Sequence, residues 1–531
     1  MKTLNFLTTG AAAAMLLLGS CTKDVDNPQG GGNGDGGVVE GIPTYATVSL
    51  SQRSGAGTYA GAGDYVGGNS EATTEEKGIA SAAVLVFNQN DILENYVKFT
   101  KPANEGDPWA MTFPTTTGKK RLFAVANLPD ASYTTLEDIF EGKNGKTAAD
   151  KQLANICKII QTITAIGDAT TANGFYMSNV YPLIDPQTKK TATTEPQVTV
   201  ENITDEDVND GPDGDKLNNN FTIYIGRMVA KVTPSIDANL KPLSGDGEID
   251  LANAAYRVRN NPTRFYTFPV YTTVKGQDVL SSPYFERTYD FKNPVDYTDK
   301  NTSVGAADFF DNGTNKYQPT DPAKPDNDKW VNPFGPKMGE DSYLTENSPQ
   351  TATRHKVTFL SIAAKWTPNV NATFLNADGT KVADPDKNGV QAIAGAGGTF
   401  WRVQKWEGGL IKGYLDGIYV AEPEKYTDPD DGALKTAFAT NRGDDGYLKV
   451  KYDGGIAYWA YWMKNSNNGA IAEKYALKRN NHFKVKIISI DGVGEPTEDD
   501  NLDKDDLEAN TSMKATIEVL NWNVVDIEGG I

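Results

Sequence analysis

Residues 44–51 read Thr-Tyr-Ala-Thr-Val-Ser-Leu-Ser, and the interpretation of the fold begins from this stretch. Ala46, Val48 and Leu50 alternate with hydroxyl-bearing residues, which is typical of a strand with one apolar face. Glycine-rich sequence lies on both sides, so no hairpin partner is close in the sequence. We therefore expect this strand to pair with a distant segment of the chain.

The residues before this strand predict export and lipidation. Lys2 precedes an apolar run over residues 6–18 that is too short to span a bilayer and is typical of an export signal. The run ends in Leu-Gly-Ser before Cys21, which resembles the lipobox of bacterial lipoproteins. We expect a signal peptide over residues 1–20 and acyl chains such as palmitate on Cys21, followed by a flexible glycine-rich tether. An ordinary signal peptide with an incidental cysteine is the alternative.

Short strand-like segments separated by turn residues recur downstream and predict a mainly β protein. The clearest are residues 82–87, 119–127, 221–232, 356–364, 413–420, 448–452, 456–463 and 483–490. One helix is expected over residues 150–163, where apolar residues at helical spacing would bury the thiol of Cys157. We expect two tandem β-sandwich domains with few short helices, over residues 54–218 and 219–494. The acidic, turn-rich residues 205–220 mark the boundary.

The C-terminus holds a second isolated strand. Residues 495–508 contain eight acids and one lysine, so residues 495–511 are expected to be an extended linker. Residues 512–531 follow as an apolar strand whose phase changes at Leu520, which indicates a bulge or two segments that face different sheets. Its apolar positions are Met513, Ala515, Ile517, Val519, Leu520, Trp522 and Val524. Such a strand either folds back into its own domain or completes the sheet of another molecule, and both destinations stay open.

The composition limits the chemistry available to the chain. Its 531 residues include 51 basic and 70 acidic side chains, which give a net charge of −19. That balance argues against a nucleic-acid partner, because phosphate contacts need clustered cations. Two His and two Cys leave little material for a zinc site, a disulfide framework or Cys/His catalysis. We therefore expect no metal, no cofactor and no enzyme activity.

Several isolated motifs are better read as ordinary structure. Residues 384–389 match the first half of a calcium loop, but the twelfth position is Gly395 instead of Glu, so a turn is favoured. Residues 442–444 read Arg-Gly-Asp, a tripeptide common by chance in a chain of this length. The aromatic residues within 458–462 would occupy both faces of a strand, which favours a buried strand over a carbohydrate platform. His482 is expected to be structural.

The order of several motifs resembles the fimbrillins of Bacteroidales, the lipoprotein-derived subunits of type V pili. The motifs are the lipobox at Cys21, the strand before Arg53, and residues 227–232, 455–462, 478–485 and 517–522. The resemblance spans nearly the whole chain except residues 290–350, and within the family it is to a shaft subunit of the Porphyromonas minor fimbria. It implies transthyretin-like sandwiches and a donor strand over residues 512–531, formed by the seven apolar residues named above.

The resemblance also implies a mechanism. In that family, a trypsin-like, Arg-specific protease removes the first strand, and the C-terminal strand of the next subunit fills the groove. By similarity the cut lies between Arg53 and Ser54, so that residues 21–53 hold the lipid tether and the removable strand. An outer-membrane lipoprotein precursor would thus become part of an extracellular fimbrium.

The implied partners are other copies of the chain, accessory tip and anchor subunits, the protease, the outer membrane through the lipid, and a host or bacterial surface ligand. Two other classes stay open. One is a monomeric, surface-anchored glycan-binding lipoprotein that uses Trp401, Trp406 and Trp459. The other is a secreted hydrolase with paired carboxylates.

Overall fold

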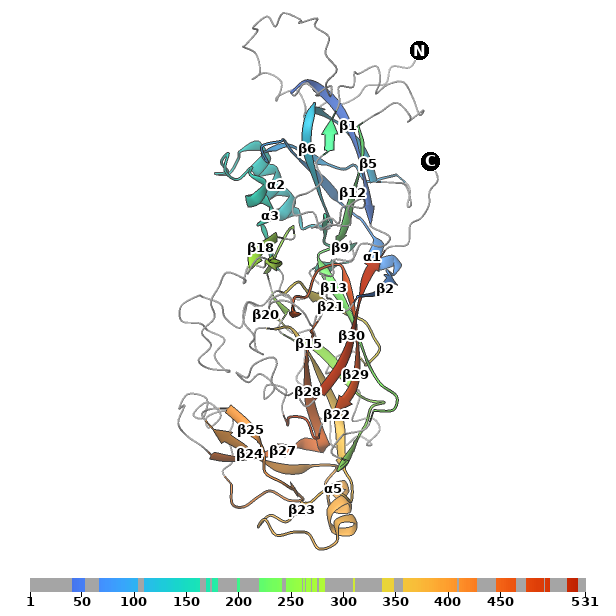
Figure 1. The fold of residues 1–531 in the computed structure, drawn as a ribbon, viewed down its shortest axis with the longest axis vertical. Helices are drawn as coiled ribbons and strands as arrows, with labels where there is room; N and C mark the ends of the chain where they lie inside the picture. The colour runs from blue at the N-terminus through green and yellow to red at the C-terminus, as the bar shows by residue number, and fades with distance from the viewer. Residues whose placement is uncertain are drawn as a thin grey trace, which may run out of the picture.

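The computed structural model describes a mainly β protein, elongated along one axis (Figure 1). The described residues are 41–52, 66–103, 109–162, 169–171, 174–179, 198–200, 219–240, 245–259, 261–262, 264–268, 270–274, 277–281, 309–310, 337–347, 357–407, 410–426, 446–464, 474–490, 492–496 and 513–523. Several sheets and a few short helices lie along this axis. The mainly β content with few short helices is what the sequence predicted.

An eight-stranded sheet forms the first body, in the order β4-β3-β6-β10-β12-β1-β5 with β11 paired to β6. Its strands are β1 (Pro43–Gln52), β3 (Ala82–Phe87), β4 (Leu93–Lys98), β5 (Trp109–Thr116), β6 (Gly118–Ala126), β10 (Met177–Asn179), β11 (Val198–Val200) and β12 (Asn220–Arg227). The two end strands approach each other, because Thr116 of β5 donates a 2.6 Å hydrogen bond to Glu94 of β4. The sheet thus closes around one apolar core.

Two helices pack on this body, α2 (Asp130–Glu141) and α3 (Leu153–Cys157). The helix expected over residues 150–163 is wrong beyond Cys157. Leu153 and Ile156 are buried as the spacing predicted, but Ile160 is 45% exposed and begins β7 (Ile160–Thr162), which pairs with β17 (Arg264–Tyr266). Cys157 is half-buried and packs against the core instead of being fully enclosed. A strand partner distant in sequence overrides the local helical pattern here.

Two sheets face each other in the second body and share one core. One has the order β2-β30-β29-β13-β21, and the other has β14-β22-β15 with β28 paired to β22. The strands are β2 (Val66–Glu71), β13 (Val229–Ile236), β14 (Gly247–Ile249), β15 (Ala255–Arg259), β21 (Ser342–Thr345), β22 (Phe359–Pro368), β28 (Ile456–Trp462), β29 (Asn481–Ile490) and β30 (Met513–Asn523). Val485 of the first sheet and Trp366 and Trp459 of the second are buried in that core.

The change from one body to the other lies at Met228. The sequence predicts a single strand over residues 221–232, whereas the structure ends β12 at Arg227 in the first sheet and begins β13 at Val229 in the second. The change therefore lies C-terminal to the expected boundary between residues 218 and 219. Apolar residues continue on both sides of Arg227, so the hydropathy pattern of the run does not mark the change of sheet.

A small sheet lies at the far end of the molecule from β1 (Figure 1). It contains β23 (Phe374–Leu375), β24 (Phe400–Glu407), β25 (Leu410–Tyr414), β26 (Ile418–Tyr419) and β27 (Gly446–Tyr452). A π-helix (Pro385–Val390), α5 (Gln391–Gly395) and a 3-10 turn (Asp453–Gly455) accompany it. In sequence the sheet lies between β22 and β28, two adjacent strands of the second body.

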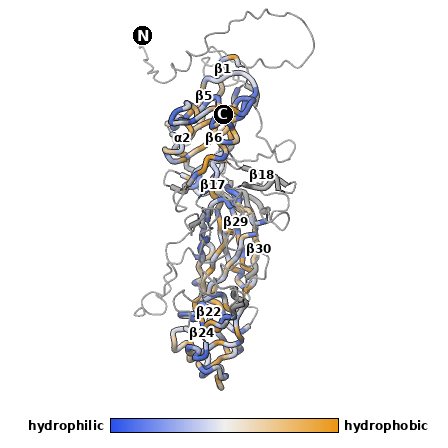
Figure 2. The backbone as a smooth tube through the Cα atoms, turned by 90° about the vertical axis from the view of Figure 1, so that its left-hand side faces the viewer, coloured by the Kyte–Doolittle hydropathy of each residue, from blue (hydrophilic) through white to orange (hydrophobic). Residues whose placement is uncertain are grey.

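The remaining short elements are α1 (Thr74–Lys77), β8 (Thr170–Thr171), β9 (Gly174–Phe175), β16 (Asn261–Pro262), β18 (Val270–Val274), β19 (Gln277–Ser281) and β20 (Phe309–Phe310). Figure 2 shows polar and apolar residues interspersed along the whole described trace. No helix in the described ranges combines the length and apolar character needed to cross a bilayer.

Candidate functional site

The first strand, β1, lies inside the sheet of the first body. It pairs in parallel with β12, from Thr47 opposite Asn220 to Gln52 opposite Ile225. On its other side it pairs antiparallel with β5, from Pro43 opposite Thr116 to Leu50 opposite Trp109. Among the described strands, β5 has no partner except β1. Loss of β1 would therefore leave two unpaired strand edges facing each other across a gap.

The inner face of β1 is part of the apolar core. Ala46, Val48 and Leu50 are 3%, 0% and 8% exposed, respectively. The outer face is polar, and the hydroxyls of Thr47 and Thr112 lie 2.8 Å apart across the β1–β5 pair. The alternation read from the sequence is therefore confirmed, as is the expected distant partner. Removal of the strand would open an apolar groove with room for one small and two larger side chains.

Further hydrogen bonds fix the N-terminal end of β1. The backbone N–H of Thr117 donates to the carbonyl of Ile42 at 2.8 Å, and that of Gly41 donates to the carbonyl of Thr117 at 3.1 Å. Asn219 donates its side-chain amide to the carbonyl of Tyr45 at 2.9 Å. β1 is thus fully integrated along its length.

Both residues of the predicted cleavage site, Arg53 and Ser54, lie outside the described residues, as does the predicted lipidation residue Cys21. β1 ends at Gln52, so Arg53 is the next residue in the chain after the strand. The position of the predicted cut in the sequence thus coincides with the end of β1.

The C-terminal strand, β30, lies in the second body of its own chain. It pairs antiparallel with β29 from Asn521 opposite Asn481 to Met513 opposite Ile490. Ile517 is 7% exposed and belongs to the core, whereas Ala515 is half-buried. Of the two destinations left open by the sequence, this structure shows the strand folded back. Val524 lies outside the described residues.

In the described pairings β30 itself has no extra residue at Leu520, where the sequence indicated a bulge. β30 also pairs in parallel with β2, and the register of that pairing shifts between Val519 and Asn521. The shift lies opposite Gly67 and Gly68 of β2, which places an extra residue in β2 across from Leu520. Against β29 the register is continuous at this point, and its own shift lies near Lys514.

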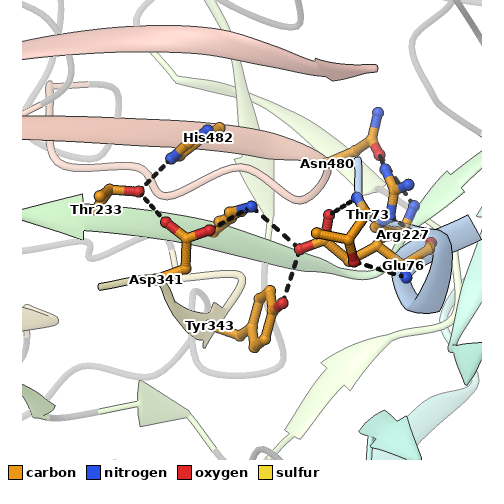
Figure 3. A network of polar contacts seen from close by, with 9 residues as sticks. Thr73, Glu76, Arg227, Thr233, Asp341, Tyr343, Asn480 and His482 are labelled. Atoms are coloured by element: carbon orange, nitrogen blue, oxygen red, sulfur yellow. Dashed lines mark hydrogen bonds and ion pairs between the residues drawn. The ribbon is translucent and has the colours of Figure 1, made fainter. Parts of the chain in front are cut away.

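A buried polar network joins the segment after β2 to both bodies (Figure 3). Its centre is Glu76 of α1, which is 1% exposed. Thr73 and Glu76 form a capping box, with the Thr73 N–H donating to Glu76 at 2.7 Å. The second carboxylate oxygen accepts a 2.7 Å bond from the Tyr343 hydroxyl and lies 3.2 Å from Lys231 Nζ. These three partners come from the N-cap of α1, from β21 and from β13.

Arg227, the last residue of β12, is the second buried charge of the network. Its Nε donates to the carbonyl of Glu76 at 2.9 Å. Its backbone N–H donates to the side-chain oxygen of Asn480 at 3.1 Å, and the Asn480 N–H donates to the carbonyl of Val229 at 2.9 Å. Asn480 has a φ of 57°, a left-handed conformation that Asn tolerates better than most residues. Burial lowers the pKa of Arg227 to about 10, so the side chain stays charged at neutral pH.

His482 ends the network on the β29 side (Figure 3). Its Nε2 lies 2.6 Å from the hydroxyl of Thr233, which itself donates to Asp341. Because that hydroxyl proton is used on Asp341, the arrangement assigns the donor role to His482 Nε2. Burial and then the nearby Lys231 lower the pKa of His482 to about 4, against the opposing effect of Asp341. His482 is therefore neutral at physiological pH and acts as a hydrogen-bond donor.

A second buried ion pair connects the two bodies. Arg479 makes a bidentate contact with Glu346, at 2.6 Å through Nε and 3.0 Å through Nη2. It also donates to the carbonyls of Tyr266 and Thr267 at 2.6 and 3.0 Å, and to Ser178 of β10 at 3.3 Å. The guanidinium of Arg479 thus joins Ser178 in the sheet of the first body to Glu346, which follows β21 of the second body.

The motif residues quoted from the sequence meet at this junction, but several of their partners were not predicted. Lys231 of one motif and His482 of another lie in one network, whereas Glu76, Tyr343 and Asp341 were missed. The spacing of Thr73 and Glu76 is a capping-box signal that could have located α1. No local signal reveals that the Glu76 carboxylate is buried between two bodies.

The alternative sites read from the sequence do not assemble in the described residues. Trp459 is fully buried and Trp401 packs against the core of the small sheet, while the side chain of Trp406 and residues 442–444 lie outside the description. The expected burial of residues 458–462 on both faces of their strand is confirmed. Asp384 caps the π-helix by accepting from the Lys387 N–H at 3.1 Å, in keeping with the favoured turn.

Two family models match separate regions of the chain. The family model described as major fimbrial subunit protein (FimA) matches residues 46–223. The model described as major fimbrial subunit protein type IV, fimbrillin, C-terminal, matches residues 450–528. No curated protein matches the chain significantly.

Several solved structures are similar at low sequence identity. A fimbrillin (FimA) from Porphyromonas gingivalis W83 has 13% identity and a TM-score of 0.41, covering 91% of this chain and 98% of that chain. A cell adhesion protein from Parabacteroides distasonis has 12% identity and a TM-score of 0.43, covering 91% and 100%. The tip fimbrial protein Mfa3 from Porphyromonas gingivalis has 12% identity and a TM-score of 0.34, covering 90% and 100%.

Proposed function

Since this chain belongs to the fimbrillin family, whose models match residues 46–223 and 450–528, we propose that it is a structural, non-enzymatic subunit of a surface fimbria. The precursor is exported and anchored in the outer membrane by acyl chains on Cys21. An Arg-specific, trypsin-like protease then cuts between Arg53 and Ser54. The cut subunit polymerises by donor-strand exchange and supports adhesion.

One observation carries this proposal, namely the place of β1 inside its sheet. Three of its side chains belong to the core, and its backbone pairs with a strand on each side. Burying a Val or Leu side chain contributes roughly 1.5–3 kcal/mol, and the open groove would expose this surface to water. A groove of this kind favours the binding of another strand with the same pattern.

The last strand has the pattern that the groove requires. Ala46, Val48 and Leu50 present one small and then two larger aliphatic side chains at alternate positions. Residues 515, 517 and 519 repeat this order as Ala, Ile and Val. This correspondence supports β30 as the donor, with the remaining donor residues continuing the strand on either side.

A chain that carries both the removable strand and a full donor strand can accept one neighbour and donate to another. We therefore assign it to the shaft, in many copies per fibre. Its partners are other copies of itself, tip and anchor subunits, the protease, the membrane through the lipid, and a host or bacterial surface ligand.

Limited trypsin digestion of the full-length precursor tests this function. We expect one early cut after Arg53, followed by SDS-resistant ladders of subunits. The Arg53→Ala variant should stay a precursor and form no ladders, because β1 continues to fill the groove. Normal fibres on cells that express Arg53→Ala would contradict the proposed cleavage.

A further inference from the structure

β2 lies against the proposed donor strand in the folded-back state. Val66 is paired with Val519, Asn69 with Asn521, Ser70 with Trp522 and Glu71 with Asn523. β2 is the end strand of its sheet, with β30 next to it and β29 beyond. A segment from the N-terminal part of the chain thus covers the outer edge of the last strand.

β2 covers only one half of β30. β29 pairs with β30 from Met513 to Asn521, whereas the pairing with β2 runs from Val519 to Asn523. At the C-terminal tip (residues 519–523), Val519 and Asn521 are paired on both sides, whereas Trp522 and Asn523 are paired with β2 alone. A strand that leaves its sheet by its free end must first break the pairing of this tip with β2, so the outer ladder is the first barrier to release.

The two ends of β2 are held differently. Three residues after Glu71, α1 begins, and its Glu76 is fixed by Lys231, Tyr343 and the Thr73 cap at the junction. The other end, at Val66, leads back along the chain toward Gln52 of β1. A cut between β1 and β2 therefore leaves the Glu76 end of β2 fixed and makes its Val66 end a free chain end.

We propose that β2 is a clamp that keeps the donor strand in its own subunit until the precursor is cut. This inference rests on the proposed function, and it adds that a single cleavage after Arg53 has two effects. It releases β1 and opens the acceptor groove, and it frees the Val66 end of β2 so that the tip of β30 can leave. Acceptor and donor become available together, and the uncut precursor offers neither.

The sequence of β2 suits a contact that must open. It reads Val-Gly-Gly-Asn-Ser-Glu, and its two glycines lie at the register shift opposite Leu520. Gly, Asn and Glu are all depleted in strands, and Gly in a strand interior weakens it. The ladder to β29 is longer by comparison, and its register is continuous at Leu520. The outer contact is thus the weaker of the two, which allows the loss of one tether to shift its equilibrium.

Hydrogen exchange on the full-length wild-type precursor, before and after trypsin, tests the clamp without any substitution. Amides of residues 519–523 should exchange slowly in the uncut chain and about ten-fold faster after the cut. Amides of β13, which is not paired with β2 or β30, serve as the internal control. Unchanged exchange at residues 519–523 after complete cleavage overturns the proposal.

A disulfide between β2 and β30 provides the second test. Asn69 and Asn521 are directly paired, and neighbouring strands lie about 4.8 Å apart, within the Cα range that a disulfide needs. The oxidised Asn69→Cys/Asn521→Cys precursor should be cut after Arg53 but form no ladders, and reduction should restore them. The two single variants are the controls.

The outcomes separate the clamp from strand exchange. If the oxidised variant forms ladders as fast as the reduced one, β30 does not have to separate from β2 before polymerisation. The clamp then fails, and strand exchange itself still stands. If the cut wild-type chain forms no ladders, strand exchange fails and the clamp fails with it.

Discussion

At the scale of single residues, the junction depends on buried charges that share their partners. Lys231 lies 2.6 Å from Asp341 and 3.2 Å from Glu76, so one cation serves two carboxylates. Removing one partner of a buried ion pair is typically far more costly than removing an exposed one, because the remaining charge stays desolvated. We therefore expect substitution of the junction residues to lower stability more than substitution of exposed acidic residues elsewhere in the chain.

His482 gives this junction a defined pH dependence. Its pKa is about 4 in the folded chain and near 6.5 when unfolded. Between these values the unfolded chain binds a proton that the folded chain does not, so stability decreases as the pH falls through this window. Above this pH window His482 is neutral in both states, so its titration does not affect the free energy of unfolding. At pH about 5 the loss relative to neutral pH should be about 2 kcal/mol.

Urea unfolding of the wild type and of His482→Gln, at pH about 7 and about 5, measures this effect. Gln keeps a donor for Thr233 but does not titrate, so the contributions of Asp341, Lys231, Glu76 and Lys484 remain in both proteins. The free energy of unfolding of the variant should fall less between the two pH values. Equal losses in both proteins would mean that His482 does not titrate in this window.

At the scale of elements, the sequence predicted strands well and their partners poorly. The apolar alternation located β1 almost to the residue, and continuous apolar runs located β3 and β28, which are buried on both faces. The break at Met228 and the short strand β7 were missed, since each depends on a contact made far away in sequence. The same limit applies to the site. The two isolated strands were visible, whereas the contact of β30 with β2 was not.

The difference between the two environments of β30 provides an element-scale prediction. Ala515 is half-buried in its own subunit, but by the proposed correspondence it would take the place of Ala46, which is 3% exposed. Ala515 also packs against the core of its own body, so Ala515→Lys should lower stability modestly, but it should reduce ladder formation at least about ten-fold, because a fully buried charge is more costly. Ladders on denaturing gels after trypsin measure the effect.

Ala392→Lys is the matched control, because Ala392 is exposed on α5. It should fold, be cut and polymerise as the wild type does. Polymerisation of Ala515→Lys at the rate of this control would show that residue 515 does not enter the groove.

At the scale of the whole molecule, the two bodies are joined by buried polar contacts as well as by the chain. Arg479 connects Glu346, Thr267 and Ser178, which come from both bodies. Arg479→Lys keeps the charge but loses the planar fork, so carbonyls at the junction lose their donors. We expect a cost of about 3 kcal/mol and a thermal transition that separates into two.

Differential scanning calorimetry of the full-length chain checks this expectation. Glu137→Gln is the control, since it removes only the exposed pair with Lys98, and it should change stability by no more than about 0.5 kcal/mol. A single, unshifted transition for Arg479→Lys would mean that the two bodies unfold together without this residue.

The direction of β1 has a mechanical consequence. It is parallel to β12 and antiparallel to β5, so a replacement strand reproduces both ladders only if it enters in the same direction. Every joint of a fibre built in this way has the same polarity. Tension that acts along the strand loads its hydrogen bonds in shear, all at the same time. Tension across the strand would instead break them one after another. Such a joint resists flow strongly when pulled lengthwise and yields more easily when peeled from one end.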